Sequence, residues 1–212
     1  MSKMSELQKI AEELESDKSL PLRESNLVFG EGNPDAEVLF IGEAPGFYEN
    51  ELRRPFVGRA GKLLDELIKG IGWRREDVYI TNIVKRRPPE NRDPDPVEIA
   101  AYSPYLSRQI AVLNPKAIAT LGRFSMNYFL PEAKISRDRG KVFKVDGCFI
   151  FPLYHPAAAL RSTQMLKELR ADFERLPEVL ASGGAGAIEA KSPAFSAGAA
   201  ERPQKTNQGS LF

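Results

Sequence analysis

The only histidine of the 212-residue chain, His155, lies at a position suited to hydrogen-bonding chemistry. It follows the apolar letters FPLY, which are typical of the end of a buried strand, and Pro156 fixes the chain behind it. A lone histidine more often has a structural role than a catalytic one. Its uniqueness, its place at a strand end and the proline favour the catalytic interpretation, in which the imidazole donates a hydrogen bond.

Asn82 closes a second apolar run, DVYIT, and a proline-rich basic loop follows it. A carboxamide offers one acceptor and two donors, which suits it to recognise the edge of a nucleobase. Cations in such a loop favour contact with phosphates. The loop carries Lys85, Arg86, Arg87 and Arg92. The alternative is a charged loop that is only solvated.

Two glycine-containing segments supply the other candidates. GEAPG, residues 42–46, is a tight turn that holds Glu43 and lets backbone N–H groups approach a ligand oxygen. RRPFVGRAG, residues 53–61, places Phe56 just before a helix, where its ring could stack on a flat ligand. A plain strand-to-helix turn and a phenylalanine of the core are the alternatives.

Strands that alternate with helices must position these residues. Apolar runs predict strands at residues 36–42, 77–84, 115–122 and 141–154, the last with a hairpin at Asp146-Gly147. Helical periodicity predicts helices at residues 5–16, 58–72, 96–114, 123–130 and 156–180. We therefore predict an α/β fold, a three-layer sandwich of helices around a central four-stranded parallel sheet. Ligands bind at the carboxyl ends of such strands, where His155 and Asn82 lie.

The composition is that of a cytoplasmic globular protein with a mildly basic middle. Hydrophobic residues make up 42% of the chain, without an apolar run long enough for a membrane span and without an export signal. The net charge is −5 over residues 1–40, +5 over 41–180 and +1 over 181–212. The basic middle weakly favours a polyanionic partner. The single cysteine, Cys148, excludes an internal disulfide and a site that needs several thiolates.

Taken together, these motifs resemble the family-four uracil-DNA glycosylases, the thermophilic and bacterial branch of the uracil-DNA glycosylase superfamily. The resemblance covers residues 22–176. It is carried by VFGEGNPDAEVLFIGEAPG, RPFVGRAGKLLDE, VYITNIVK, RPPENRDPDP and YHPAAALR, in the order of the family. It implies hydrolysis of the bond between uracil and deoxyribose in DNA, which leaves an abasic site for base excision repair.

The resemblance also assigns roles to pocket residues by position. Phe56 resembles the wall on which uracil stacks, and Asn82 resembles the residue that recognises the uracil edge. The turn that lines the uracil pocket corresponds to Gly42, Glu43 and Ala44.

The remaining roles concern the leaving base and the DNA. His155 resembles the residue that donates a hydrogen bond to O2 of uracil, and Leu160 and Arg161 resemble the loop that enters the duplex. The base must rotate out of the helix to be reached, and a neutral imidazole donor is sufficient to stabilise the uracil anion. Since no lysine stands out as a Schiff-base nucleophile, a monofunctional enzyme without a lyase step is expected.

One departure from the family concerns its cofactor. Family-four enzymes hold a four-iron–four-sulfur cluster with four cysteines. The matching positions here carry no thiol; they are about Glu15, Lys18, Arg86 and Tyr102. We expect no cluster and no metal, because such clusters need several thiolates. An ion pair of Glu15 with Lys18 or Arg86 is one possible replacement.

A second departure concerns the attacking water. The best-known branch of the superfamily orients it with an aspartate, and the matching residue here is Ala44. Glu43 and Glu49 are the candidate groups instead, and Glu43 is favoured. The room beside Ala44 suggests a wider range of bases, such as hypoxanthine, as an alternative. A non-catalytic DNA-binding protein of the same fold is the alternative from another class, against which the intact pocket residues argue.

The end of the chain differs in composition. Residues 1–180 form the predicted glycosylase domain, and residues 181–212, rich in Gly, Ala and Ser, are expected to form a disordered tail. The tail ends in QGSLF, which resembles short peptides that bind the sliding clamp through Gln208, Leu211 and Phe212. A plain disordered end is the alternative. The expected partners are uracil-containing DNA and, through this peptide, the sliding clamp, and the protein is expected to be a monomer.

Overall fold

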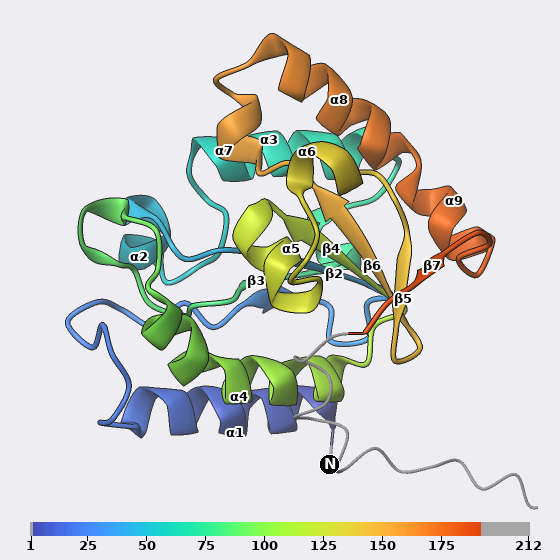
Figure 1. Cartoon of the computed structure of the whole chain (residues 1–212). Coiled ribbons are helices and arrows are strands. Elements are labelled where there is room, and N and C mark those ends of the chain that lie inside the picture. Colours follow the sequence, from blue (N-terminus) through green and yellow to red (C-terminus); the bar gives the residue numbers. More distant parts are fainter. Residues whose placement is uncertain (1, 192–212) are drawn as a thin grey trace, which may run out of the picture.

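Parallel strands lie at the centre of the computed structural model, which describes residues 2–191 (Figure 1). Their order across the sheet is β3-β2-β4-β6, and each neighbouring pair is parallel. They are β2 (Val38–Gly42), β3 (Tyr79–Asn82), β4 (Ala117–Leu121) and β6 (Cys148–Leu153). Every residue of β2, β3 and β4 is buried, as strands covered on both faces require. The predicted four-stranded parallel centre is therefore present.

Short edge strands widen the sheet to seven strands within residues 2–191. β1 (Glu31–Gly32) pairs antiparallel with β3, and β5 (Phe143–Val145) pairs antiparallel with β6. The β5–β6 turn is made by Asp146 and Gly147, whose φ angles are both positive, which confirms the predicted hairpin. The sheet is wider than predicted because these edge strands are too short to show a hydrophobic period.

Helices cover both faces of the sheet, as the three-layer sandwich requires (Figure 1). On one face lie α4 (Pro96–Leu113) and α5 (Arg123–Phe129), with α1 (Lys3–Ser16) packed beside α4. On the other face lie α3 (Arg59–Gly70), α8 (Thr163–Glu174) and α9 (Leu176–Ala181). The shorter helices are α2 (Phe47–Leu52), η1 (Arg75–Asp77), η2 (Pro89–Asn91), α6 (Ile135–Asp138) and α7 (Pro156–Ala159).

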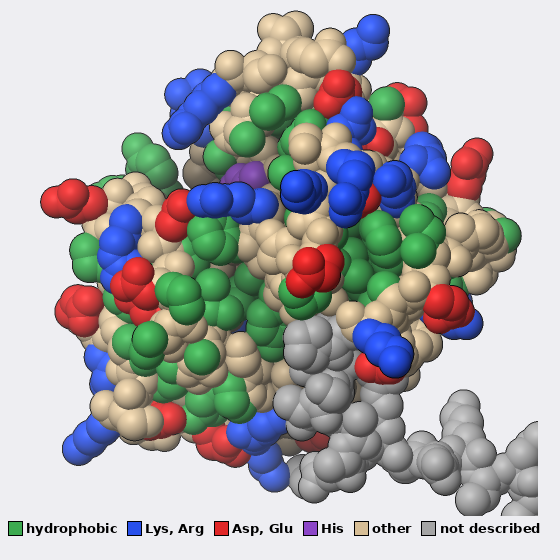
Figure 2. Space-filling model, in the orientation of Figure 1, with side chains coloured by type: hydrophobic (Ala, Val, Ile, Leu, Met, Phe, Trp, Pro, Cys, Tyr) green, Lys and Arg blue, Asp and Glu red, His purple; other side chains and the backbone are tan. Residues whose placement is uncertain are grey.

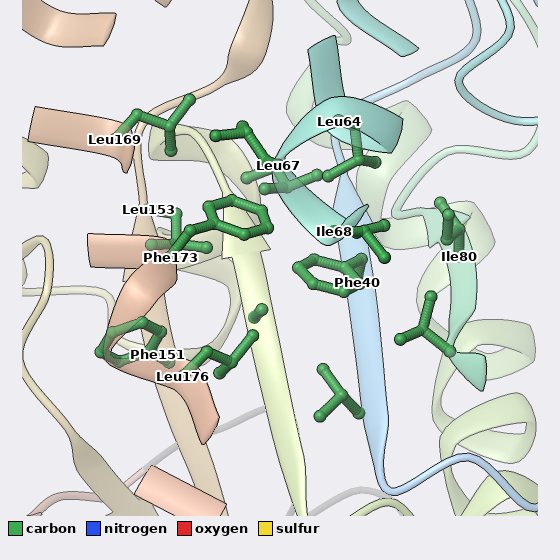
Figure 3. Close-up of a cluster of buried hydrophobic side chains, with 14 of the residues drawn as sticks. Phe40, Leu64, Leu67, Ile68, Ile80, Phe151, Leu153, Leu169, Phe173 and Leu176 are labelled. Carbon is green, nitrogen blue, oxygen red and sulfur yellow. The ribbon is translucent and has the colours of Figure 1, made fainter. Parts of the chain in front are cut away.

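The α3–α8 face is held by an aromatic and aliphatic core (Figure 3). The ring of Phe40 in β2 stacks on that of Phe173 in α8, with centroids 5.6 Å apart. Leu64 and Ile68 of α3 are fully buried in the same core. Burial of each such side chain contributes about 1.5–3 kcal/mol. This packing fixes the helices against the strands whose ends carry the polar residues.

The C-terminal part of the domain departs from the prediction in two ways. The helix predicted at residues 156–180 is divided into α7, α8 and α9, and Ser162 caps α8 by accepting from the N–H of Met165. The chain also stays in the fold beyond residue 180, because β7 (Ile188–Glu189) pairs with β5. The predicted domain boundary therefore lies too early. Residues 192–212, with the predicted clamp peptide, lie outside the described residues. Among residues 2–191, no helix combines the length and apolarity needed to cross a bilayer.

Candidate active site

The carboxyl ends of the central strands bring the predicted pocket residues to one edge of the sheet. β3 ends with Asn82, its register partner Gly42 ends β2, and Glu43 follows directly. On the other side, β4 leads into Gly122 and β6 leads into His155. Figure 2 shows the purple side chain of the only histidine recessed in the surface, with Lys and Arg side chains on the same face. The sequence prediction of a shared site at this edge agrees with this placement.

Gly42 forms the floor of the site. A Cβ atom built on Gly42 would lie 2.4 Å from Oδ1 of Asn82 and 2.5 Å from Cζ of Phe56. Both side chains therefore converge on the bare backbone of this glycine, and any other residue would collide with them. The glycine is required here for close approach rather than for an unusual backbone angle.

The carboxamide oxygen of Asn82 is buried without a hydrogen-bond partner. The side chain is 2% exposed, and its Oδ1 has no hydrogen-bond partner. A buried acceptor without a partner costs about 1–3 kcal/mol, so proteins seldom keep one without a function. A ligand with an N–H group beside the Phe56 ring would satisfy it.

Phe56 forms an apolar wall. Its side chain is buried, and its ring centroid lies 5.7 Å from that of His155, with the ring planes 31° apart. The backbone of Phe56 has a positive φ of 52°, and its carbonyl oxygen accepts a hydrogen bond from Arg75 at 3.2 Å. Gly61 makes room for that carbonyl, since a Cβ there would lie 1.9 Å from the oxygen. The loop is thus held in a conformation that directs the ring towards the floor of the site.

His155 is held as a neutral hydrogen-bond donor. It caps α7, and its Nδ1 accepts a hydrogen bond from the backbone N–H of Ala157 at 3.1 Å. Burial lowers the pKa of the imidazole from 6.5 to about 4, and the charge of Glu49 raises it slightly. With Nδ1 accepting, the proton of the neutral ring resides on Nε2. Gly122 lets β4 approach the ring, because a Cβ there would lie 3.1 Å from Cβ of His155.

Glu43 is the titratable group nearest the floor of the site in sequence. Burial and, to a smaller extent, the charge of Asp93 raise the pKa of its carboxyl, Arg123 lowers it, and the resulting pKa is about 7. A carboxyl group that titrates near neutral pH can act as a general base at physiological pH. The role of Glu43 in positioning water stays a prediction.

Comparison with known proteins identifies the family of this chain. The family model of the uracil DNA glycosylase superfamily matches residues 29–177. The chain belongs to the uracil-DNA glycosylase superfamily. It is 48% identical to the type-4 uracil-DNA glycosylase of Sulfurisphaera tokodaii over 83% of this chain and 86% of the relative. It is 50% identical to that of Saccharolobus solfataricus over 74% and 77%, and 43% identical to that of Archaeoglobus fulgidus over 83% and 94%.

The other two residues predicted for this glycosylase pocket lie beside it. The Oε1 of Glu49, in α2, accepts hydrogen bonds from the N–H groups of Val57 and Gly58, at 2.9 and 2.8 Å. The carboxylate therefore fastens α2 to the loop that carries Phe56. Ala44 is partly buried against the apolar cluster between α1 and α4.

The basic loop after β3 is partly wrong as a predicted DNA contact. Lys85 is fully buried, and its ammonium donates to Thr81 and to Gln109, each at 2.6 Å. Burial lowers the pKa of Lys85 well below its ordinary value. Arg86 is 3% exposed and donates to Glu15. Neither cation can meet a phosphate in this position, so the prediction fails for both.

The remaining predicted DNA contacts lie at the surface. Arg87 is partly exposed with its guanidinium over the ring of Phe47, and Arg92 is exposed and paired with Glu98. Leu160 is 40% exposed after α7, and Arg161 is exposed beside it. These positions are open to a partner.

Sequence reasoning missed Arg123, which follows Gly122 at the end of β4. Its guanidinium donates to Asp93 at 2.6 Å and lies over the ring of Phe124, 4.4 Å from the centroid. The letters LGR at a strand end were the available signal, but the partner Asp93 is 30 residues away in the chain.

The residues at the expected cluster positions do not fit an iron–sulfur cluster. Arg86 donates to Glu15 at 2.5 Å and to the backbone of Ser25, so a cation–carboxylate pair occupies this place. Tyr102 is fully buried and donates to the carbonyl of Pro21 at 2.7 Å. Lys18 is exposed. An ammonium and a guanidinium cannot ligate iron, and residues 2–191 contain no group of three or more His, Cys, Asp or Glu side chains arranged to hold a metal ion. Of the two ion pairs expected for Glu15, the one with Arg86 is present.

Proposed function

We propose that this protein is a uracil-DNA glycosylase that hydrolyses the N-glycosidic bond of uracil in DNA and leaves an abasic site for base excision repair. The observation that carries the proposal is the buried, unpartnered Oδ1 of Asn82 beside Phe56 and His155. An acceptor, a flat apolar wall and a neutral donor are complementary to an extruded pyrimidine with N–H and carbonyl groups on its edge. The similarity to type-4 uracil-DNA glycosylases supports the same activity.

Recognition rests on the edge of the base. Uracil leaves the duplex, stacks on Phe56 and lets Oδ1 of Asn82 accept from its N3–H. Cytosine has no hydrogen at N3, so it would leave this buried oxygen unpaired, at a cost of about 1–3 kcal/mol. The Nε2–H of His155 donates to O2 of uracil.

Bond cleavage moves electrons onto the base. As the bond between C1′ and N1 lengthens, uracil becomes an anion and deoxyribose becomes cationic. The donor on His155 stabilises the charge on O2, and removal of such a donor typically costs about 2.7–4 kcal/mol. Water then forms a bond to C1′, and its proton passes to the carboxylate of Glu43. Glu49 retains Phe56 in place through the two backbone N–H groups that it accepts.

The test is excision from a defined duplex. A labelled duplex with one uracil, incubated with the protein and then treated with alkali, should break at the uracil and only after alkali. Breakage without alkali would indicate a lyase step. A variant that combines Asn82→Ala and His155→Ala, purified in the same way, controls for glycosylase from the host. An intact strand with the wild type would favour the non-catalytic DNA-binding protein. A parallel duplex with hypoxanthine tests the wider range of bases.

We also propose that no iron–sulfur cluster is bound, because the Glu15–Arg86 pair occupies the place where the cysteines would stand. Purified protein should contain no stoichiometric iron and no visible absorbance. A brown preparation that loses both colour and fold on treatment with a chelator would contradict this proposal.

A last proposal concerns partners outside the described residues. Gln208, Leu211 and Phe212 are proposed to dock a sliding clamp, which suits a short peptide with two apolar anchors. Deletion of residues 208–212 should abolish association with the clamp and leave excision from short duplexes unchanged. A monomeric state and a cytoplasmic location stay predictions, which sedimentation and cell fractionation would check.

A further inference from the structure

An ion pair that no sequence motif predicted lies close enough to Glu43 for both of its charges to act on that carboxyl. Arg123 begins α5, directly after β4, and Asp93 lies in the loop between β3 and α4. Their side chains meet at 2.6 Å. Because β2 lies between β3 and β4 in the sheet, the segments that follow β3 and β4 flank the residue that follows β2. That residue is Glu43, and the charges of both partners act on it.

The Arg123–Asp93 pair is weak enough for another anion to replace the carboxylate. The side chains of Arg123 and Asp93 are 63% and 62% exposed, so water and salt weaken their attraction. The ring of Phe124 lies against the guanidinium, with its centroid 4.4 Å from Cζ of Arg123, and so supports it from one side. A planar guanidinium binds a phosphate at least as well as a carboxylate. DNA that delivers a nucleotide to His155 brings its backbone to this face, where other Lys and Arg side chains gather (Figure 2).

We propose that Asp93 and Arg123 form an exchangeable ion pair close to Glu43, in which Asp93 holds Arg123 ready until a phosphate of the substrate DNA replaces the carboxylate. This inference rests on the proposed uracil-DNA glycosylase activity and adds a phosphate-binding residue and its competitor. Arg123 supplies affinity for DNA. Asp93 limits that affinity, because its carboxylate must first be displaced from Arg123. The displaced carboxylate then repels the phosphates of the DNA backbone.

The first test measures DNA binding without turnover. The probe is a duplex that carries one 2′-fluoro-2′-deoxyuridine, whose electron-withdrawing fluorine slows cleavage of the glycosidic bond. For Arg123→Gln we expect about a tenfold rise in Kd and a slope of log Kd against log salt that is smaller by about 1. For Asp93→Asn we expect a Kd lower by about threefold or more, with an unchanged slope.

Matched controls separate the exchange from a general change of charge. Glu90→Gln removes one negative charge from the same exposed loop, away from the Arg123 pair, so its Kd should stay nearer to the wild-type value than that of Asp93→Asn. Arg74→Gln breaks another exposed ion pair, with Asp77, which precedes β3 and so lies at the amino ends of the strands, and should leave Kd unchanged. Unfolding temperatures identify any variant that binds poorly because it is destabilised.

A second readout is the pH dependence of single-turnover excision. Within the described residues, the charges that act on Glu43 come from Asp93, which raises its pKa, and Arg123, which lowers it. Asp93→Asn should therefore shift the acidic limb of the rate profile to lower pH, and Arg123→Gln should shift it to higher pH. A merely structural ion pair would produce no such opposite shifts.

The outcomes are distinct from those of the proposed function. If the wild type excises uracil but Arg123→Gln binds the fluorinated duplex with wild-type Kd and salt slope, the exchange is wrong and the glycosylase assignment stands. If Asp93→Asn weakens binding, Asp93 supports DNA contact rather than competing with it, and the proposal is overturned. If the wild type excises nothing, the glycosylase proposal fails, whereas the binding data still test the phosphate contact.

Discussion

The backbone N–H of Ala157 donates to Nδ1 of His155 at 3.1 Å, and this one hydrogen bond determines which ring nitrogen carries the proton of the neutral imidazole. The cap fixes Nδ1 as an acceptor, so the proton of the neutral imidazole is on Nε2. The low pKa of about 4 keeps the ring neutral at physiological pH.

His155→Gln should lower the rate of uracil excision by about 10²–10³-fold in single-turnover assays, because one donor to the developing anion is misplaced. Binding of a 2′-fluorouridine duplex should change little. An unchanged excision rate would remove His155 from the mechanism.

The same residue should make stability depend on pH. The imidazole titrates near 6.5 in the unfolded chain and at about 4 in the fold, so the unfolded chain binds more protons between these values. The free energy of unfolding should therefore fall by on the order of 3 kcal/mol as pH drops from 6.5 to 4. In urea unfolding, the His155→Gln variant should lack this pH-dependent loss of stability but keep the pH dependence that comes from the carboxyl groups. Identical pH profiles for both proteins would contradict the buried, neutral state.

Glu43→Gln should be less active yet more stable above neutral pH. The folded carboxyl has a pKa of about 7, above its ordinary 4.5, so the folded state binds more protons between these values and loses stability as pH rises through 7. At pH 8 the variant should gain on the order of 1–2 kcal/mol, after allowance for partial exposure of the carboxyl. Chemical unfolding at pH 6 and pH 8 checks the predicted gain in stability, and excision rates at the same two pH values check the predicted loss of activity. A variant with full activity would exclude Glu43 as the group that orients water.

Gly42→Ala should close the pocket without unfolding the protein. The added methyl group would lie 2.4 Å from Oδ1 of Asn82 and 2.5 Å from the Phe56 ring, so uracil loses both its partners. The excision rate should fall by at least about 10²-fold, because each loss of about 1.4 kcal/mol in binding of the transition state slows the reaction tenfold. Gly70→Ala is the control, because a Cβ at Gly70 meets nothing within 4 Å. Equal activity of the two variants would show that the site lies elsewhere.

Glu15→Gln should destabilise the fold by about 1–3 kcal/mol, since it leaves the buried guanidinium of Arg86 without its carboxylate. Glu13→Gln, which breaks the exposed pair with Arg108, should cost under about 1 kcal/mol. Thermal unfolding of both variants compares them directly. Equal effects would mean that the Glu15–Arg86 pair contributes no more than a surface ion pair.

The pocket could be predicted from the sequence because its information is local. Each of Asn82, Gly42 and His155 follows an apolar run, and parallel strands bring such ends together at one edge. Family resemblance then supplied their roles.

The basic loop could not be predicted in the same way. Lys85, Arg86 and Arg87 are consecutive cations, but only Arg87 reaches the surface. Lys85 can be buried because Gln109, 24 residues away in the chain, accepts a hydrogen bond from it. Arg86 can be buried because Glu15, 71 residues away, accepts a hydrogen bond from its guanidinium. Such partners depend on how helices pack, which a charge pattern along the chain does not encode.

The order β3-β2-β4-β6 has a consequence for how the activity arises during synthesis. Gly42 and Asn82 end β2 and β3, whereas Gly122 and His155 lie just after β4 and β6, and β6 is the last of these strands to be made. A nascent chain in which β6 has not yet docked lacks His155 beside Phe56, so it cannot release bases from DNA indiscriminately. Catalytic competence thus arrives in a single step, when the final central strand joins the sheet.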